Sequence, residues 1–151
     1  MIAVEPEPTL RALATTAAAK APVPVRVLAG IADHLPLGDE SVDAAVASLV
    51  LCSVPDQARA LAELRRVVRP GGELRFYEHV IPNRQPKRLV LQVADKSGLW
   101  PWIAGVCHPA RDTTAAIMRS GFEIQTIERF MFAVSRLEPS IPHVLGTARR
   151  A

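Results

Sequence analysis

The sequence predicts an α/β fold with an open, mostly parallel sheet and helices on both faces. Along the first 80 residues, segments with the pattern of strands alternate with segments of helical periodicity, which is typical of β-α-β units. The strongest segment, residues 44–54, is apolar on both sides instead of alternating. A strand that helices cover on both faces has this pattern, so we expect a doubly wound parallel sheet.

The amino-terminal part predicts two short strands joined by a helix. Residues 2–4 form a short apolar run, and the apolar side chains that follow recur at helical spacing until two prolines stop the helix. Residues 25–29 then predict a second strand, which Gly30 closes. A short, loop-like crossover is expected over residues 29–42.

A helix with clear start and stop signals follows the strong strand. Asp56 lies at its start, and Arg65 and Arg66 near its end suit the negative end of the helix dipole. The turn Pro70-Gly71-Gly72 ends the helix, because proline and glycine interrupt helices. Residues 74–77 predict the next strand.

The remaining half of the chain is less regular. We expect a helix, an irregular segment, a second helix, an antiparallel edge strand and a last strand, over residues 84–97, 100–108, 111–120, 122–130 and 143–149. A chain of 151 residues suits one domain over residues 1–151.

The composition disfavours several classes of protein. Apolar residues make up 49% of the chain and charged residues 22%, which is typical of a folded globular protein. A net charge of +3 with 5% aromatic residues does not indicate a nucleic-acid-binding protein. No apolar run reaches the ~18 residues of a membrane span, and no basic and apolar leader follows Met1. Two cysteines make no disulfide framework, so we expect a cytoplasmic protein.

Several stretches, taken together, resemble the class I S-adenosylmethionine-dependent methyltransferases that act on small molecules. They are Gly-Ile-Ala-Asp-His-Leu-Pro at 30–36, Ser-Val-Asp at 41–43, residues 49–54, and Glu-Leu-Arg-Arg-Val-Val-Arg-Pro-Gly-Gly at 63–72. The stretches at 76–80, 105–108 and 111–113 look closest to the thiol methyltransferase-like subgroup. The resemblance covers nearly the whole chain.

The resemblance implies a seven-stranded, Rossmann-like sheet in the order 3-2-1-4-5-7-6, with an antiparallel seventh strand. On this plan residues 2–4 are the second strand, so we expect an amino-terminally truncated domain that lacks the first strand and its glycine-rich loop. All eight glycines lie at position 30 or later. We expect one of three arrangements: residues 2–4 pair directly with the fourth strand, another copy of the chain covers the gap in a homo-oligomer, or residues 1–29 are poorly ordered.

The resemblance also implies a site for the cofactor S-adenosylmethionine. Glu5, at the tip of the second strand, would accept hydrogen bonds from both ribose hydroxyls; the alternative is a carboxylate that stabilises a helix start. Ile31 and Ala32 would border the adenine, and Ile31 offers only apolar contact where many relatives carry an aspartate. The backbone of Ser48 and Leu49 would touch the methionine part; the alternative is ordinary strand core.

Two histidines are candidate catalytic residues. In methyl transfer the protein positions the acceptor and removes its proton, and His79 or His108 would be that base because histidine titrates near neutrality. The alternative is that Glu78 and His79 only order the end of a strand. Cys107, His108 and His79 lack a fourth ligand and a recognisable spacing, so we expect no metal site. We expect Cys52 to be a small buried hydrophobic residue.

The predicted function is S-adenosylmethionine-dependent methyl transfer to a small-molecule acceptor, at a thiol, a hydroxyl or a carbon. The alternative is a catalytically inactive methyltransferase-like protein that acts as a binding or interaction module. A nucleotide-binding oxidoreductase on a similar sheet is disfavoured, because it would need a glycine fingerprint after its first strand and would not explain the Arg-Pro-Gly-Gly turn.

Overall fold

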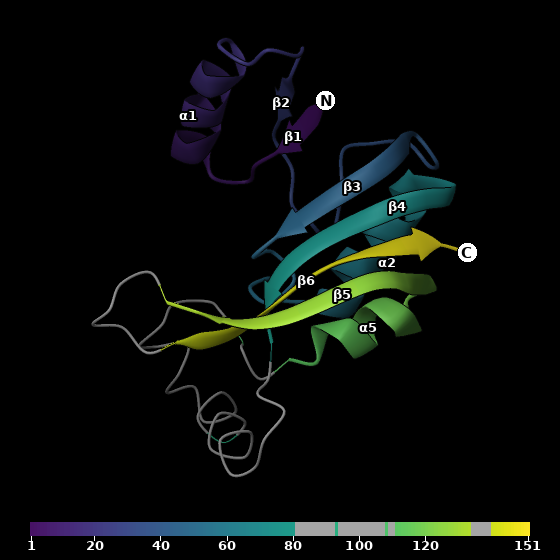
Figure 1. Ribbon diagram of the computed structural model, residues 1–151. Coiled ribbons are helices and arrows are strands. Elements are labelled where there is room, and N and C mark those ends of the chain that lie inside the picture. Colours follow the sequence, from purple (N-terminus) through teal and green to yellow (C-terminus); the bar gives the residue numbers. More distant parts are fainter. Residues whose placement is uncertain (81–92, 94–107, 109–110, 134–139) are drawn as a thin grey trace.

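The computed structural model describes residues 1–80, 93, 108, 111–133 and 140–151 (Figure 1). Its elements in chain order are β1 (Ile2–Val4), α1 (Pro8–Ala18), β2 (Arg26–Leu28), β3 (Val42–Ser48), α2 (Gln57–Val67), β4 (Val68–His79), α5 (Thr113–Arg119), β5 (Phe122–Phe132) and β6 (Ile141–Arg150). The helix expected over 84–97 and the irregular segment expected over 100–108 lie outside the described residues, apart from residues 93 and 108. No helix in the described ranges has the length and apolar composition needed to cross a bilayer.

Carboxylates begin all three of these helices. Glu7, Asp56 and Asp112 each accept a hydrogen bond from the amide three residues later, at 2.6, 3.0 and 3.1 Å. An acidic side chain at this position satisfies one of the unpaired amides of the first turn and suits the positive end of the helix dipole. Asp56 therefore marks the start of α2 as the sequence predicted, and Asp112 sets the start of α5 at Thr113.

The strands form two sheets. β1 and β2 are a parallel pair, and β3-β4-β6-β5 form a four-stranded sheet in which β3 and β4 are parallel. β6 runs antiparallel to both of its neighbours, and β5 is an antiparallel edge strand as predicted. The α/β class predicted from the sequence is therefore confirmed.

The order of the strands reproduces the plan implied by the resemblance, apart from the place of the first strand. β1 pairs with β2, and within the described residues it does not pair with β3. Residues 1–29 form the ordered unit β1-α1-β2, which lies beside the β3 edge of the larger sheet (Figure 1). The expectations of direct pairing with the fourth strand and of poor order over residues 1–29 are therefore wrong. A second copy of the chain in this place stays a prediction.

The core lies between the four-stranded sheet and one layer formed by α2 and α5. Its largest fully buried side chains include Leu61 of α2, Ile117 of α5 and Phe76 of β4. On β3, Ala47 is buried in this core, whereas Val46 is 74% exposed on the other face. The prediction that both faces of this strand are covered is wrong for Val46.

The same apolar segment also leaves the sheet earlier than expected. β3 ends at Ser48, and Leu49 takes a positive φ of 56° that starts a turn. The apolar run continues because Leu51 and Cys52 are buried in that turn, each at 0% exposure. The predicted strand end at residue 54 is therefore wrong, since the pattern reports burial and not extended backbone.

The Arg-Pro-Gly-Gly stretch lies inside β4, which begins directly after α2. α2 ends at Val67, and the register between β3 and β4 jumps where residues 69–72 bulge out of the ladder. Only glycine fits at Gly72, because an added Cβ would lie 2.7 Å from the carbonyl oxygen of Asp43. The predicted helix end at Pro70-Gly71-Gly72 is too late, because Val68 is already extended and begins the next strand.

An ion pair on α2 holds the crossover between β2 and β3. Arg66 donates to Glu63 at 2.7 Å and to the Leu37 carbonyl at 2.8 Å, and Glu63 accepts from the Leu35 amide at 2.8 Å. The guanidinium of Arg66 lowers the pKa of Glu63 to about 2, so the pair stays charged at neutral pH. These bonds fix the loop that follows β2 against α2.

The close packing of β6 gives a stability prediction. An added Cβ at Gly146 would lie 2.5 Å from both the Phe76 ring and the Thr126 carbonyl oxygen, whereas Gly38 has nothing within 4 Å. We expect Gly146→Ala to lower the free energy of unfolding by about 1–3 kcal/mol through overpacking, and Gly38→Ala to change it by less than about 0.5 kcal/mol. Urea denaturation measures both, and equal effects of the two substitutions would contradict this account of the core.

Candidate functional site

The carboxyl ends of the parallel strands meet on one side of the molecule. The arrowheads of β1, β3 and β4 point to the same side (Figure 1). The strand order reverses between β1 and β3, because the chain goes from β1 outward to β2 and then crosses to β3. In open α/β sheets ligands bind beyond the carboxyl ends at such a switch point, so a ligand site is expected at this edge.

Glu78, at the end of β4, is the most buried acidic side chain of this edge. Its residue is 0% exposed. One carboxylate oxygen accepts from the amides of Val50 and Leu51 at 3.1 and 2.9 Å, and the other accepts from the Cys52 amide at 3.0 Å. The turn after β3 therefore closes around a single carboxylate.

Burial and hydrogen bonding act on the pKa of Glu78 in opposite directions. Removal from water raises the pKa to about 8 from an ordinary value of 4.5, while the amides of Leu51 and Cys52 limit the rise because they favour the charged form. Burial is the larger effect. The folded protein therefore keeps the proton on Glu78 at a pH where an unfolded chain has lost it.

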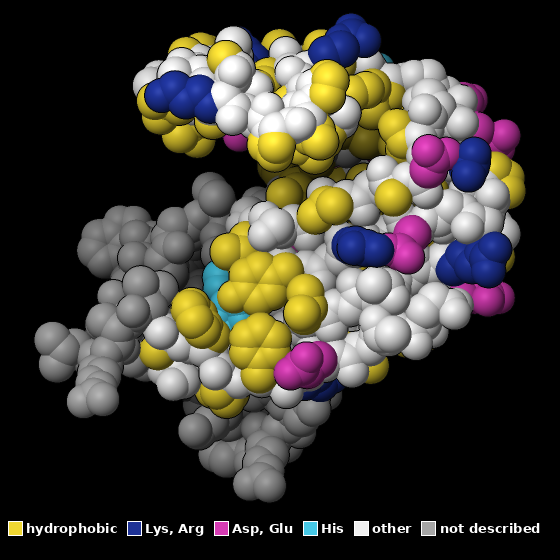
Figure 2. All heavy atoms as spheres, turned by 45° about the horizontal axis from the view of Figure 1, so that its top comes forward, with side chains coloured by type: hydrophobic (Ala, Val, Ile, Leu, Met, Phe, Trp, Pro, Cys, Tyr) yellow, Lys and Arg dark blue, Asp and Glu magenta, His cyan; other side chains and the backbone are white. Residues whose placement is uncertain are grey.

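The strand β6, the antiparallel neighbour of β4, places His143 beside His79. His143 lies opposite His79 in the ladder between β4 and β6, with ring centroids 4.5 Å apart. Its ring stacks on Tyr77 at 5.1 Å and on Phe130 at 5.9 Å, and the edge of Phe132 lies 5.5 Å away. We call these five residues the aromatic cluster. Figure 2 shows a histidine surface set among hydrophobic side chains on this face.

The surroundings of His143 fix its protonation. Its Nδ1 lies 2.8 Å from the Ile141 carbonyl oxygen, which can only accept, so Nδ1 carries the proton in the neutral ring. Burial lowers the pKa of His143, and this keeps the ring neutral near pH 7. His143 therefore presents an uncharged ring to His79.

The two predicted catalytic histidines both lie next to Cys52. Nδ1 of His79 is 3.6 Å from the Cys52 sulfur, and the amide of His108 donates to the Cys52 carbonyl at 2.7 Å. Cys52 is buried, as the sequence predicted. Cys107 lies outside the described residues, and within the described ones no group of three or more His, Cys, Asp or Glu side chains could hold a metal.

Glu5 lies directly after β1, as expected, and it also supports the start of α1. Its amide donates to the Leu28 carbonyl at 3.0 Å, and its Oε1 accepts from the Glu7 amide at 2.9 Å. In the described part of the chain, its Oε2 has no hydrogen-bond partner. The helix-start alternative therefore accounts for one oxygen of the carboxylate and leaves the other available to a ligand.

The other predicted cofactor residues also lie at strand ends. Ile31 follows β2 and is 49% exposed, and Ala32 packs against the core. Ser48 is the last residue of β3 and is exposed, and Leu49 is 39% exposed. Ordinary strand core, the alternative for Ser48 and Leu49, is therefore wrong. A free carboxylate oxygen with exposed apolar side chains at one edge fits a ligand that has a diol and an apolar ring.

His143 and the phenylalanines of β5 are residues that the sequence did not single out. Residues 143–149 were expected only as a last strand. The resemblance implied the strand order, and the missing information was the register between β4 and β6, which puts His143 opposite His79. The sequence signal that could have found His143 is its place at the start of a strand that runs antiparallel to the one carrying His79.

The buried carboxylate gives a prediction about pH. Because the folded-state pKa of Glu78 lies above the unfolded value, its contribution to stability is fully present below about pH 4.5 and is lost as the pH rises to about 8. Glu78→Gln removes this titration and leaves the Cys52 amide without an acceptor, at a cost of about 1–3 kcal/mol. The measurement is the free energy of unfolding of both proteins across this range. A stability difference between them that does not shrink toward pH 8 would contradict the assignment.

Comparison with known proteins agrees with this geometry. The methyltransferase domain family matches residues 1–76, half of the chain. Thiol S-methyltransferase TMT1B of Mus musculus is 38% identical over 112 residues, which are 74% of this chain and 45% of that protein. Demethylmenaquinone methyltransferase of Thermobifida fusca is 45% identical over 80 residues, 53% of this chain and 34% of that protein. The chain thus spans less than half the length of either relative.

A solved structure shows the same fold. A methyltransferase structure from Bacillus halodurans superposes with a TM-score of 0.78, at 15% identity, over 99% of this chain and 82% of that one. The strand order and the family match point the same way. The chain belongs to the methyltransferase domain family and has the Rossmann-like fold of class I S-adenosylmethionine-dependent methyltransferases.

Proposed function

We propose that this protein transfers a methyl group from S-adenosylmethionine to a thiol on a small, apolar acceptor. The observation that carries the proposal is the aromatic cluster around His79, which lies at the same sheet edge as the strand tips at Glu5 and Leu49. The relatives support the reaction class, because their names describe methyltransferases. A thiol acceptor is favoured by the thiol methyltransferases among them.

Glu5, Ile31 and Leu49 would hold the cofactor. The free oxygen of Glu5 suits a ribose hydroxyl, and the exposed Ile31 and Leu49 suit the apolar parts of the ligand. Ala32 and Ser48 adjoin them at the ends of β2 and β3. When bound, S-adenosylmethionine supplies an electrophilic methyl group, so the protein has to position the acceptor and take its proton.

His79 would take the proton of the acceptor thiol. His79 is half-buried and its neighbour His143 is buried and held neutral, so His79 accepts the proton while the His143 ring stays uncharged. The thiol sulfur keeps the electron pair of its S–H bond and becomes the nucleophile. Phe130, Phe132 and Tyr77 would enclose the apolar part of the acceptor, because aromatic side chains favour such contact.

Cofactor binding tests the first half of the proposal. We expect Glu5→Gln to weaken S-adenosylmethionine about 10- to 100-fold, since one charge-assisted hydrogen bond is lost. Glu123→Gln, which removes an exposed carboxylate of β5, is the matched control and leaves the affinity unchanged. Isothermal titration calorimetry measures both. If the unmodified protein gives no heat at millimolar cofactor, the protein is the inactive binding module and not an enzyme.

Methyl transfer to a simple thiol tests the second half. With dithiothreitol as acceptor, we expect His79→Asn to lower the rate about 10²- to 10⁴-fold near pH 7 and to leave cofactor affinity unchanged. The difference in rate between this variant and the unmodified protein should narrow above a pH of about 8.5, where a thiol ionises without a general base. A purely structural loss would not recover at high pH, so a deficit of constant size would overturn the role of His79.

A further inference from the structure

A serine of the turn after β3 is connected to His79 through Cys52. Ser53 is half-buried, and its hydroxyl donates to the Leu49 carbonyl at 3.2 Å. Its Oγ lies 3.5 Å from the sulfur of Cys52, and the same sulfur lies 3.6 Å from Nδ1 of His79. The Leu49 carbonyl, the hydroxyl, the thiol and the imidazole ring therefore form a chain of three contacts.

The direction of these contacts follows from the protons that are present. A hydroxyl, a thiol and a neutral imidazole ring each have a single proton to donate. The proton of Ser53 lies on the Leu49 carbonyl, so Oγ accepts from the thiol of Cys52. The thiol proton is then used, and the sulfur accepts from Nδ1 of His79. If the thiol donated to Nδ1 instead, the contact between Oγ and the sulfur would have no proton.

The buried carboxyl of Glu78 is compatible with this direction. The side chain of Cys52 is also hydrogen-bonded to Glu78, and burial raises the pKa of Glu78 to about 8. Near pH 7 the carboxyl therefore holds a proton of its own, which it donates to the sulfur. A thiol sulfur has more than one lone pair, so it accepts from both Glu78 and His79 and still donates to Ser53.

The other neighbours of His79 in the described residues do not reverse this direction. The ring of His143 lies 4.5 Å away, and burial lowers its pKa, so it adds no charge near pH 7. His108 meets the same turn through its backbone amide, which donates to the Cys52 carbonyl. Which ring nitrogen of a histidine holds the proton is set by the hydrogen bond that the ring makes, and the contact of Nδ1 with Cys52 is such a bond.

We propose that Ser53, acting through Cys52, holds the proton of the neutral His79 ring on Nδ1, so that Nε2 is the nitrogen that takes the proton of the acceptor thiol. This inference rests on the proposed function for the role of His79. In that step the S–H bond of the acceptor breaks, an N–H bond forms at Nε2, and the electron pair stays on the acceptor sulfur. Ser53 and Cys52 are positioning residues, because they act through His79.

The tautomer of His79 can be measured in the full chain, labelled with nitrogen-15 in histidine. Protonated and unprotonated ring nitrogens have well-separated chemical shifts in nuclear magnetic resonance, and His79→Asn identifies the signals of this ring by their absence. At a pH of about 7.5, between the ordinary pKa of histidine and the raised pKa of Glu78, we expect Nδ1 to be protonated and Nε2 to be unprotonated. A protonated Nε2 in the neutral ring of the unmodified protein would overturn the inference.

Substitution of Ser53 tests the chain of contacts without touching the ring. Ser53→Ala removes the acceptor of the thiol proton, so the thiol turns to Nδ1 and the proton of His79 moves to Nε2. Ser53→Thr keeps the hydroxyl and should retain the proton on Nδ1. An unchanged tautomer in Ser53→Ala would show that the serine does not set it.

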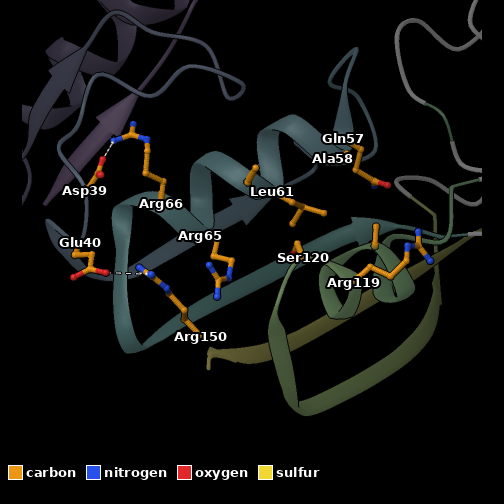
Figure 3. A pocket seen from close by; sticks show the side chains of 12 residues that line it. Asp39, Glu40, Gln57, Ala58, Leu61, Arg65, Arg66, Arg119, Ser120 and Arg150 are labelled. Carbon is orange, nitrogen blue, oxygen red and sulfur yellow. Dashed lines mark hydrogen bonds and ion pairs between the residues drawn. The ribbon is translucent and has the colours of Figure 1, made fainter.

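Ser120→Ala is the matched control. Ser120 is also half-buried and also donates to a carbonyl, that of Ile117 at 2.7 Å, but it lines the pocket between α2 and α5 (Figure 3). We expect this variant to leave the tautomer of His79 unchanged. The same change of tautomer in Ser120→Ala and Ser53→Ala would contradict the inference.

Methyl transfer separates this inference from the proposed function. With dithiothreitol near pH 7, we expect Ser53→Ala to lower kcat about 2- to 10-fold without a change in KM, and to match the unmodified protein above a pH of about 8.5. If His79→Asn does not lower the rate, the proposed function fails, while the tautomer still decides this inference. If His79→Asn lowers the rate and Nε2 is the protonated nitrogen, this inference fails and the proposed function stands.

Discussion

The turn after β3 depends on the carboxylate of Glu78. Residues 49–52 turn away from the sheet at a non-glycine residue with positive φ, and three successive amides then point at this one side chain. Without an acceptor these three donors would be unpaired, which is most unfavourable for the buried amides of Leu51 and Cys52. The acceptor comes from the neighbouring strand, so the turn after β3 depends on the end of β4.

The same turn connects the two sides of the site. Its Leu51 carbonyl accepts from Gln57 of α2 and from Arg111 ahead of α5, at 3.1 and 3.2 Å. Leu49 is left at the exposed strand edge, and Cys52 is left buried against His79. A carboxylate that is removed from water thus places one residue toward the proposed cofactor side and another toward the proposed acceptor side. The alternative expectation that Glu78 orders a strand end describes this role, and we propose a second role for His79 beside it.

Some of this architecture was predictable from local sequence, and some was not. The caps, the helix ends and the Arg-Pro-Gly-Gly bulge depend on neighbouring residues, so the order of elements could be predicted from composition and spacing. Burial is not a local property. The apolar run 44–54 did not indicate that Val46 is exposed or that the strand ends at Ser48. His143 lies at the site because β6 pairs with the distant segment β4. A single domain over residues 1–151, a cytoplasmic location and a homo-oligomer stay predictions.

The two edges of the sheet differ in chemistry, and the fold explains why. Parallel strands expose apolar tips, a carboxylate and the aromatic cluster at their carboxyl ends, whereas helix ends bring arginines to the amino ends. The central claim is that Glu78 holds the turn between these elements, and amide hydrogen exchange tests it most directly. We predict slow exchange at Val50, Leu51 and Cys52 in the unmodified protein, and in Glu78→Gln a loss of protection greatest at Cys52, since a glutamine side chain has a single acceptor oxygen. Unchanged protection of the Cys52 amide in that variant would contradict the account.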